Sequence, residues 1–203
     1  MKEKKQNLFN PTFWNQKYIN NDIGWDIGSP TPIFVNWSKS LKERKKILIP
    51  GSGRGHDALF LSKQNHDIFA NDFSKEAIKY LNIKAKELKL PIKTICQNFF
   101  SLSSYYGIMD IVLEYTFFCA INPKLRLKYI KEVSRLLKKN GLFVGILLPI
   151  NKDANEGGPP YAVNYKKTLE DFKKYFELLE CKKTELSIKP RKNNEIFVIM
   201  KKK

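Results

Sequence analysis

The feature that most constrains the fold is the segment Ile47–Asp57, which reads ILIPGSGRGHD. Its apolar start predicts a buried strand, and the apolar periodicity from Ala58 onward predicts a helix. Between them, Gly51, Gly53 and Gly55 allow a tight turn in which no side chain keeps a ligand away from the backbone. A strand, a glycine-rich turn and a helix in this order indicate the ligand-binding corner of a doubly wound α/β domain.

A second predicted strand, at residues 67–72, ends at Asp72. The carboxylate of Asp72 can accept hydrogen bonds from two ribose hydroxyls. The glycine spacing distinguishes between nucleoside cofactors. A dinucleotide fingerprint requires Gly-x-Gly-x-x-Gly, whereas position 56 is His and the third glycine is Gly55. We therefore expect S-adenosylmethionine (SAM), rather than NAD, at this turn.

The rest of the chain alternates between predicted helices and strands. We expect strands at residues 46–50, 67–72, 92–96, 109–114 and 142–148, and helices at 13–18, 33–41, 55–63, 75–88, 123–139 and 168–175. Asn140 and Gly141 are expected to cap the helix at 123–139. Residues 176–187 and 195–201 predict a terminal antiparallel pair, which is typical of SAM methyltransferases and unusual for NAD domains.

These elements predict a single domain over residues 1–203, with one Rossmann-like doubly wound sheet. The sheet is expected to have seven strands, mostly parallel, with one antiparallel edge hairpin. Residues 1–25 are expected to form an N-terminal helical lid outside the sheet. At 203 residues the chain is long enough for one substantial core and too short for two ordinary domains.

Cysteine and histidine usage bounds the compartment and the metal chemistry. Cys96, Cys119 and Cys181 are widely separated and form no C-x-x-C pair, which suits a reducing cytoplasm and argues against a zinc site or a disulfide framework. The two histidines, His56 and His66, are expected near the glycine corner without metal-ligand spacing. No apolar run approaches the ~20 residues that span a membrane, and MKEKKQN at the N-terminus has no apolar signal region. We expect a cytoplasmic, metal-independent monomer.

The net charge raises the question of nucleic acid. The chain has 37 Lys and Arg against 20 Asp and Glu, a formal charge of +17. These basic residues punctuate amphipathic helices, and no tract interleaves them with aromatics at a nucleic-acid-binding spacing. The charge therefore favours a solvated lysine-rich surface over a nucleic-acid site, although such a surface can still steer small anions.

Several motifs together are more specific than the glycine turn. The order FW…Y…GWDIGSPTP, LIPGSGRGHD, DFS, QNFF, EYTFFCAINPKLR and GGPPY resembles the thiopurine S-methyltransferase family, and within it the thiol, thiocyanate and halide branch that includes the plant halide-methylating enzymes. The resemblance covers about residues 13–161. EYTFFCAINP and GGPPY carry most of it, because unrelated methyltransferases lack them.

The resemblance implies a SAM site, and each of its residues can be carried over to a matching position. The implied cofactor-binding residues are Trp14, Tyr18, Trp25, Gly51, Gly53, Asp72, Asn98, Phe99 and Tyr115. Aromatic faces at the first three positions suit a sulfonium cation, although these rings could instead attach the N-terminal segment to the core. Asn98 stands where relatives often have an acid beside the adenine amine, and Glu114 where they have Asp.

The resemblance also implies an acceptor site, at Phe117 and Tyr161. For the neighbouring Phe118 we favour a core position. The Gly/Pro-rich segment 157–161 is expected to form a stiff loop that excludes water. Its Pro-Pro-Tyr sequence invites comparison with DNA amino-methyltransferases, but it follows the fifth strand instead of the fourth. It is also preceded by Gly, which cannot accept hydrogen bonds from an amine.

No Ser/His/Asp set, Cys/His pair or carboxylate dyad is present, so we expect no catalytic acid–base residue. A thiolate, thiocyanate or halide ion is already nucleophilic and requires none. The sequence therefore predicts a SAM-dependent methyltransferase for a small sulfur nucleophile or a halide. The alternatives are another small acceptor (a metalloid oxyanion or a hydroxyl), an RNA or DNA methyltransferase if the lysines surround the pocket mouth, and a SAM-binding protein without catalysis.

Overall fold

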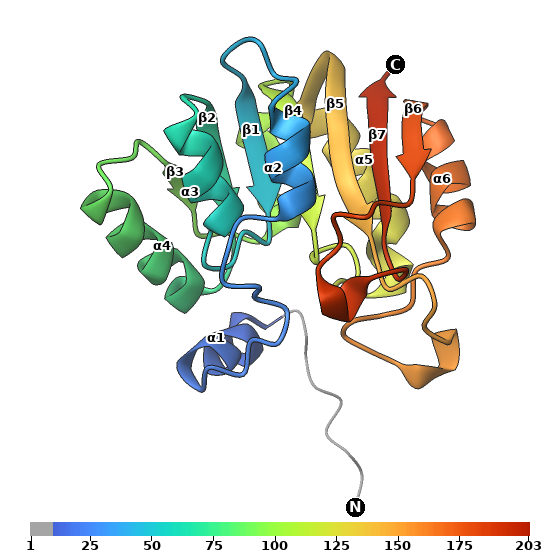
Figure 1. The fold of residues 1–203 in the computed structure, drawn as a ribbon, viewed down its shortest axis with the longest axis horizontal. Coiled ribbons are helices and arrows are strands. Elements are labelled where there is room, and N and C mark those ends of the chain that lie inside the picture. Colours follow the sequence, from blue (N-terminus) through green and yellow to red (C-terminus); the bar gives the residue numbers. More distant parts are fainter. Residues whose placement is uncertain (1–9) are drawn as a thin grey trace, which may run out of the picture.

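The computed structural model describes residues 10–203, built around a single sheet (Figure 1). Its strands are β1 (Lys46–Pro50), β2 (Asp67–Asn71), β3 (Lys93–Ile95), β4 (Met109–Tyr115), β5 (Leu137–Leu147), β6 (Phe176–Lys182) and β7 (Ile196–Lys202). They lie in the order β3-β2-β1-β4-β5-β7-β6. The first five are parallel, and β7 is antiparallel to both of its neighbours. The predicted mostly parallel seven-stranded sheet with a late antiparallel pair is confirmed.

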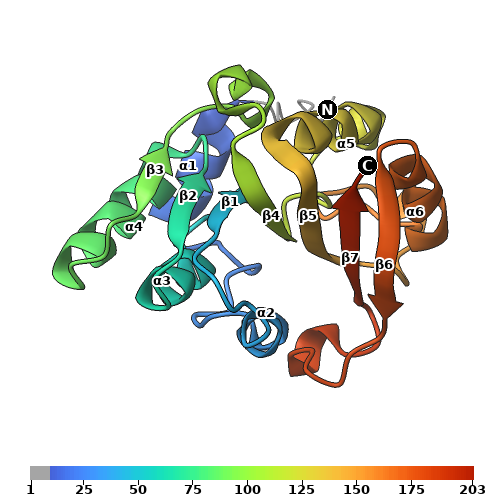
Figure 2. The same ribbon diagram turned by 90° about the horizontal axis from the view of Figure 1, so that it is seen from above.

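In the part of the chain that the structure describes, six α-helices and five short 3₁₀ helices accompany the strands. The α-helices are α1 (Pro11–Ile19), α2 (Pro32–Ser38), α3 (His56–Lys63), α4 (Lys75–Glu87), α5 (Arg126–Leu136) and α6 (Tyr165–Lys173). The 3₁₀ helices are η1 (Phe99–Ser101), η2 (Ser103–Tyr105), η3 (Pro123–Leu125), η4 (Ala154–Glu156) and η5 (Lys189–Arg191). Seen from above, α2 and α3 cover one face of the sheet, and α5 and α6 cover the other (Figure 2).

The central strands are apolar because both of their faces are covered. Ile47, Leu48 and Ile49 of β1 are all buried, with β2 on one side and β4 on the other. A parallel sheet with helices on both faces has no solvent-facing side, so its strands lack the alternation of a half-buried strand. From β1 the chain builds outward to β3 on one side and then returns to β4. This reversal of strand order marks the position at which α/β sheets bind ligands.

The helix predicted over residues 123–139 is shorter, and its predicted cap at Asn140 and Gly141 is wrong. The α-helix α5 ends at Leu136, and β5 begins at the next residue. Carbonyls in its last turn accept hydrogen bonds from the backbone N–H groups of Gly107 and Ile108, at 2.8 and 3.2 Å. The segment before β4 therefore caps the helix, a tertiary contact that no local sequence signal reports.

Two smaller expectations also differ from the structure. The first strand of the terminal pair ends at Lys182 and not at residue 187. His66 lies just before β2, at the end of the sheet opposite the glycine turn, where its Nδ1 accepts a hydrogen bond from the Lys45 N–H at 3.3 Å. The expectation that both histidines lie near the glycine corner therefore holds for His56 alone. In the described part of the chain, no helix is both long and apolar enough to cross a membrane.

Candidate functional site

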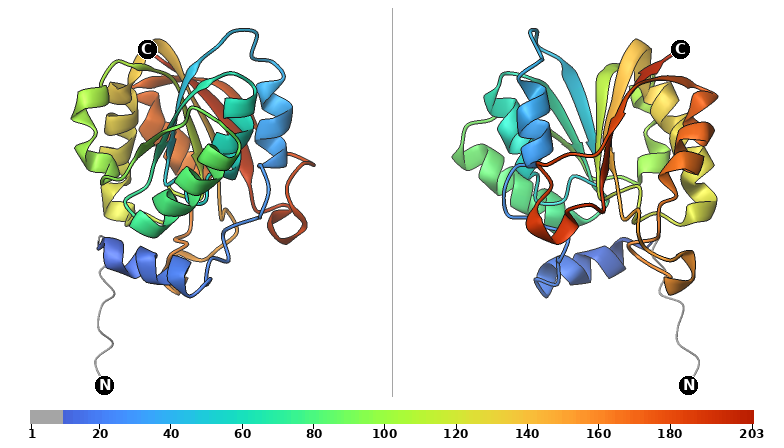
Figure 3. Two further views of the ribbon diagram at one scale, coloured as in Figure 1. Left: turned by 90° about the vertical axis from the view of Figure 1, so that its left-hand side faces the viewer. Right: turned by 45° about the vertical axis from the view of Figure 1, so that its right-hand side comes forward.

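A cavity of about 610 Å³ lies at the carboxyl ends of the central strands. Its walls come from residues 13–25, Gly51, residues 71–73, 97–100 and 116–122, the loop after β5, and residues 191 and 194. Figures 1 and 3 show α1 beneath these strand ends, apart from the helices that cover the sheet. The cavity is therefore closed below by a segment that precedes the sheet in sequence.

Residues 10–25, which we call the aromatic lid, bring three rings to the cavity. Trp14, Tyr18 and Trp25 all line it. The Trp25 ring lies edge-on to both others, with centroid distances of 5.4 Å to Trp14 and 5.8 Å to Tyr18. Burial is the main cause that raises the pKa of the Tyr18 hydroxyl far above its ordinary value, so this side chain stays neutral. The part of the predicted lid at residues 1–9 lies outside the described residues.

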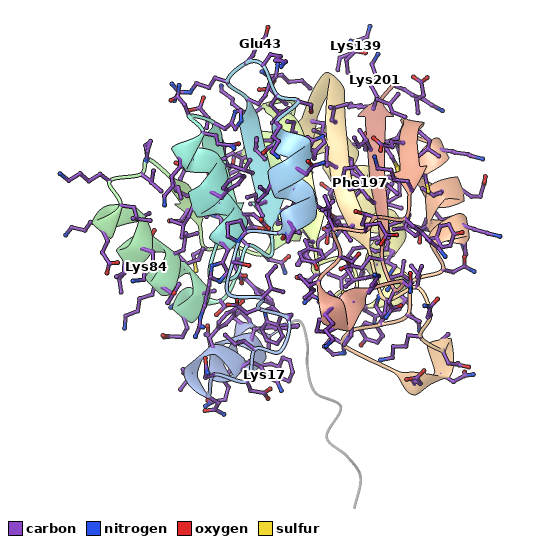
Figure 4. All side chains as sticks on the ribbon, viewed as in Figure 1. Lys17, Glu43, Lys84, Lys139, Phe197 and Lys201 are labelled. Carbon is purple, nitrogen blue, oxygen red and sulfur yellow. The ribbon has the colours of Figure 1, made fainter. Side chains whose placement is uncertain are left out.

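Polar contacts attach α1 to α4 and to the rest of the lid. The Oδ1 atom of Asn15 accepts a hydrogen bond from the Ser74 hydroxyl at 2.7 Å. Ser74 is the N-cap of α4, as predicted, and its Oγ also accepts from the Ala77 N–H at 3.3 Å. Lys17, labelled on α1 in Figure 4, forms an ion pair with Asp22 within the lid. The lid is thus bonded to the start of α4, next to the cavity wall at residues 71–73.

The turn after β1 is built around the carboxylate of Asp72. Its Oδ2 accepts a hydrogen bond from the Gly53 N–H at 3.0 Å, and its Oδ1 accepts from the Ser74 N–H at 2.9 Å. Burial raises the pKa of Asp72 to about 6, although these N–H groups favour the ionised form. Each oxygen keeps a second lone pair for a ligand. The carboxylate lines the cavity between the glycine turn and α4.

The glycines of this turn are required for two different reasons. Gly51 has φ +59°, and a Cβ there would lie 2.5 Å from Cδ2 of Phe117. Gly53 has φ +53°, and a Cβ there would lie 2.9 Å from the hydroxyl of Tyr18. Gly51 lines the cavity. Gly53 is not among the lining residues, because the aromatic lid packs over it.

Asn98 and Phe99 both line the cavity, at the start of η1. The Asn98 Oδ1 accepts a hydrogen bond from the Phe100 N–H at 2.9 Å and so caps this short helix. Phe99 is almost fully buried, with ring centroids 5.5 Å from Phe117 and 5.0 Å from Tyr129. This side of the cavity is therefore a packed aromatic wall, with the amide side chains of Gln97 and Asn98 beside it.

The wall after β4 is shaped by Glu114. Its Oε1 accepts hydrogen bonds from the N–H groups of Phe117 and Phe118, at 3.0 and 2.7 Å, and its Oε2 accepts from the Tyr129 hydroxyl. Burial raises the pKa of Glu114 to about 7. The carboxylate thus holds the turn from inside, and it is Phe117 and residues 119–122 that face the cavity.

Three positions considered from the sequence do not line the cavity. Phe118 is in the core, as favoured from the sequence. Tyr115 is not a lining residue, because its hydroxyl turns away to donate to Oε1 of Glu195 at 2.8 Å. Tyr161 is also not a lining residue. Its backbone N–H donates to the Cys119 carbonyl at 2.7 Å, and the cavity wall is formed by the glycine and prolines just before it.

Sequence reasoning missed Arg191 and Cys119. Arg191, at the end of η5, lines the cavity and donates from Nη2 to the Trp25 carbonyl at 2.7 Å, while its Nη1 is buried and has no hydrogen-bond partner among residues 10–203. The Cys119 thiol donates to the Thr116 carbonyl at 3.2 Å, and burial raises its pKa to about 12. No local motif marks Arg191, since it lies 166 positions after its lid partner.

The residues present fit SAM better than a metal centre. Three aromatic faces suit a sulfonium cation, and the Asp72 carboxylate can accept hydrogen bonds from ribose hydroxyls. Among residues 10–203, no group of three or more His, Cys, Asp or Glu side chains could hold a metal ion.

Comparison with known proteins places this site in context. The family model described as Thiopurine S-methyltransferase (TPMT) matches residues 9–203. The chain is 29% identical over 188 residues to a probable thiol methyltransferase 2 of Arabidopsis thaliana. The alignment covers 90% of this chain and 81% of the relative. It is 28% identical over 186 residues to thiocyanate methyltransferase 1 of Brassica oleracea, with the same coverage of 90% and 81%.

The fold also recurs among solved structures. One neighbour is a 1,6-didemethyltoxoflavin-N1-methyltransferase of Burkholderia thailandensis, solved with 1,6-didemethyltoxoflavin and S-adenosylhomocysteine bound. It superposes with a TM-score of 0.79 and covers 95% of this chain and 86% of its own. At 14% identity the likeness is one of fold.

Proposed function

Because the chain belongs to the thiopurine S-methyltransferase family, and is therefore a SAM-dependent methyltransferase, we propose that its acceptor is a small sulfur nucleophile or a halide ion. The sulfur acceptors we have in mind are thiols, thiocyanate and thiopurines. The names of the relatives support the sulfur acceptors. What carries the proposal in this chain is the chemistry of the cavity wall.

Among the described residues, the cavity wall offers no general base on the acceptor side. Among the described lining residues, the carboxylates are Asp22 and Asp72. Asp22 is paired with Lys17 in the lid, and Asp72 accepts backbone hydrogen bonds in the glycine turn. The Cys119 thiol holds its proton because burial raises its pKa to about 12. An alcohol would have to lose a proton during attack, and a protonated amine would have to lose one before it, whereas a thiolate, thiocyanate or halide has no proton to lose.

Arg191 favours an anionic acceptor. Its guanidinium lies over the Tyr115 ring at 4.8 Å and is held by the Trp25 carbonyl, so it is fixed at the cavity wall. The unpartnered Nη1 can donate to a ligand at no loss of an existing hydrogen bond. Phe117 and the prolines at 159 and 160 supply the apolar part of the same wall.

When bound, SAM supplies an electrophilic methyl group, so the protein needs to align the acceptor and exclude water. We assign the sulfonium and methionine portions to Trp14, Tyr18, Trp25 and Gly51, and the ribose to Asp72. We assign the adenine to Asn98 and Phe99, and the acceptor to Phe117 and Arg191. The placement of Tyr161 supports an indirect role for it, through the loop that carries the two prolines.

An acceptor panel tests the proposal. The purified chain should release S-adenosylhomocysteine from SAM with thiols, thiopurines, thiocyanate or iodide, and at least about 100-fold more slowly with phenols and amines of similar size. With a thiol, the rate should rise with pH up to the thiol's own pKa near ~8–9, and with thiocyanate it should stay flat. Faster transfer to a phenol or an amine would refute a sulfur or halide acceptor.

We further propose a cytoplasmic monomer that does not bind nucleic acid. The exposed thiols of Cys96 and Cys181 are free, as expected in a reducing compartment. The basic side chains in the cavity wall are Lys17, which is already paired, and Arg191, so the described lysines do not gather at the cavity. Lys139 and Lys201 lie at the far end of the sheet (Figure 4). Light scattering would test whether the protein is a monomer, and titration with duplex nucleic acid would test whether it binds nucleic acid.

A further inference from the structure

Three polar residues follow the first glycines of the GSGRGHD motif: Arg54, His56 and Asp57. None of them is among the residues that line the cavity. Each one instead contacts the segment between α1 and α2, which Figure 1 shows descending beside α3 toward the lid. The cofactor turn and the start of α3 are thus bonded to the segment between α1 and α2 at three points.

The first two contacts meet the part of the segment next to the aromatic lid. Arg54 donates from Nη2 to Oδ1 of Asn21 at 2.9 Å, and its guanidinium stacks over the Tyr80 ring at 4.9 Å. His56 hydrogen-bonds through Nε2 to Oδ1 of Asp26 at 2.8 Å. Arg54 Nε lies 3.8 Å from the second oxygen of the same carboxylate. The Asp26 side chain is only 8% exposed, so little water competes for these contacts.

The third contact fixes the far end of the segment. Asp57 accepts hydrogen bonds from Thr31 through both oxygens, from the backbone N–H at 2.7 Å and from the hydroxyl at 2.8 Å. Thr31 precedes α2, so this pair attaches α2 to the start of α3. It lies away from the aromatic rings and accounts for the anchoring of α2.

The first two contacts have a different consequence, because Asp26 is adjacent to Trp25. Trp25 contacts the rings of both Trp14 and Tyr18, so its position sets theirs. We propose that Arg54 and His56 are positioning residues that hold the aromatic lid closed over the cofactor cavity. The proposal rests on the cofactor site and is independent of which acceptor is used.

The test measures cofactor affinity directly, by calorimetric titration with S-adenosylhomocysteine, and needs no turnover. Arg54→Met and His56→Leu should each weaken binding about tenfold. With thiocyanate as acceptor, the KM for SAM should rise while kcat at saturating SAM changes less than twofold. The conservative His56→Gln, which can still donate to Asp26, should recover most of the affinity. Arg44→Met, which breaks an ion pair with Asp67 at the start of β2, is the matched control and should bind normally.

A double-mutant cycle distinguishes a specific contact that holds the aromatic lid from a general effect on the stability of the fold. Asp26→Leu should weaken binding at least as much as His56→Leu does, and the double variant should lose less affinity than the sum of the two single losses, because both substitutions remove the same hydrogen bond. Trypsin should also cleave after Lys17 faster in each variant. Unchanged cofactor affinity in Arg54→Met/His56→Leu would overturn the proposal. If that variant fails to fold, the same result in Asn21→Ala/Asp26→Leu, which changes only the partners of Arg54 and His56, would overturn it equally.

Discussion

At the scale of single residues, the glycine turn shows how one position can be required for a reason that its motif does not contain. The motif predicts that Gly51 keeps the backbone open to a ligand. In the folded chain the same glycine also makes room for the Phe117 ring, which comes from the end of β4. Gly51 therefore couples the cofactor turn to the acceptor wall.

Gly51→Ala tests this coupling. A Cβ at this position is strained by φ +59° and must also displace the Phe117 ring from 2.5 Å. We expect a loss of about 2–4 kcal/mol in the free energy of unfolding, together with weakened acceptor binding. The matched control is Gly107→Ala, where φ is +68° but no atom lies within 4 Å of the added Cβ. It should lose only the strain of about 1–2 kcal/mol. Equal losses in urea titrations of the two variants would show that Phe117 moves freely.

At the scale of elements, the predicted strands and helices agree closely with the structure wherever a local signal sets their ends. The β1 strand matches at both ends, and the Ser74 cap starts α4. The end of α5 differs because Gly107 and Ile108, 28 or more positions earlier, cap its carbonyls. Tyr115 and Tyr161 were predicted beside the ligands, yet hydrogen bonds to distant residues place them outside the cavity lining. Local sequence signals thus predict the ends of elements that neighbouring residues determine. They miss the ends and side-chain positions that contacts between distant residues determine.

The buried Glu114 carboxyl, which holds the turn after β4, makes the free energy of unfolding depend on pH. Burial raises the Glu114 pKa from an ordinary value of 4.5 to about 7, so between these values the folded chain keeps a proton that the unfolded chain has lost. The unfolding free energy should therefore fall as pH rises from about 4.5 to about 7, and this carboxyl should add no further change above that. Buried Asp57 and Asp72, whose pKa values are also raised, contribute with the same sign.

Glu114→Gln should reduce this loss of stability, because the amide does not titrate while its oxygen still accepts from the turn. Melting temperatures at pH 5 and pH 8 measure the effect. The exposed Glu43→Gln serves as the control and should keep the wild-type difference between the two pH values. If Glu114→Gln and the wild type lose the same amount between pH 5 and pH 8, Glu114 is not the group responsible.

At the scale of the whole molecule, the charge of +17 acts over distances that single contacts do not reach. Its exposed ion pairs, such as Lys84 with Glu87 on α4, are worth little individually. The summed field can nevertheless raise the encounter rate of an anionic acceptor, and salt screens it over a length of about 10 Å at 0.1 M.

Raising the ionic strength with potassium acetate should therefore lower kcat/KM for thiocyanate by about two- to fivefold and leave kcat unchanged. The double variant Lys139→Glu/Lys201→Glu, at the end of the sheet far from the cavity, lowers the net charge by 4, from +17 to +13. Steady-state kinetics should show a weaker salt dependence for this variant. A salt response of identical slope in both proteins would show that local contacts, and not the overall field, attract the acceptor.

The position of β7 has a consequence for the order in which the molecule can be assembled. Although β6 precedes it in the chain, β7 lies between β5 and β6 and is hydrogen-bonded to both. During synthesis the segment that becomes β6 has no strand to join until Ile196–Lys202 has emerged. Exposed Leu178 and Leu179 then remain on an unpaired strand, where they are open to association with other nascent chains. This edge of the sheet is completed last, and the chain most needs protection from aggregation just before that step.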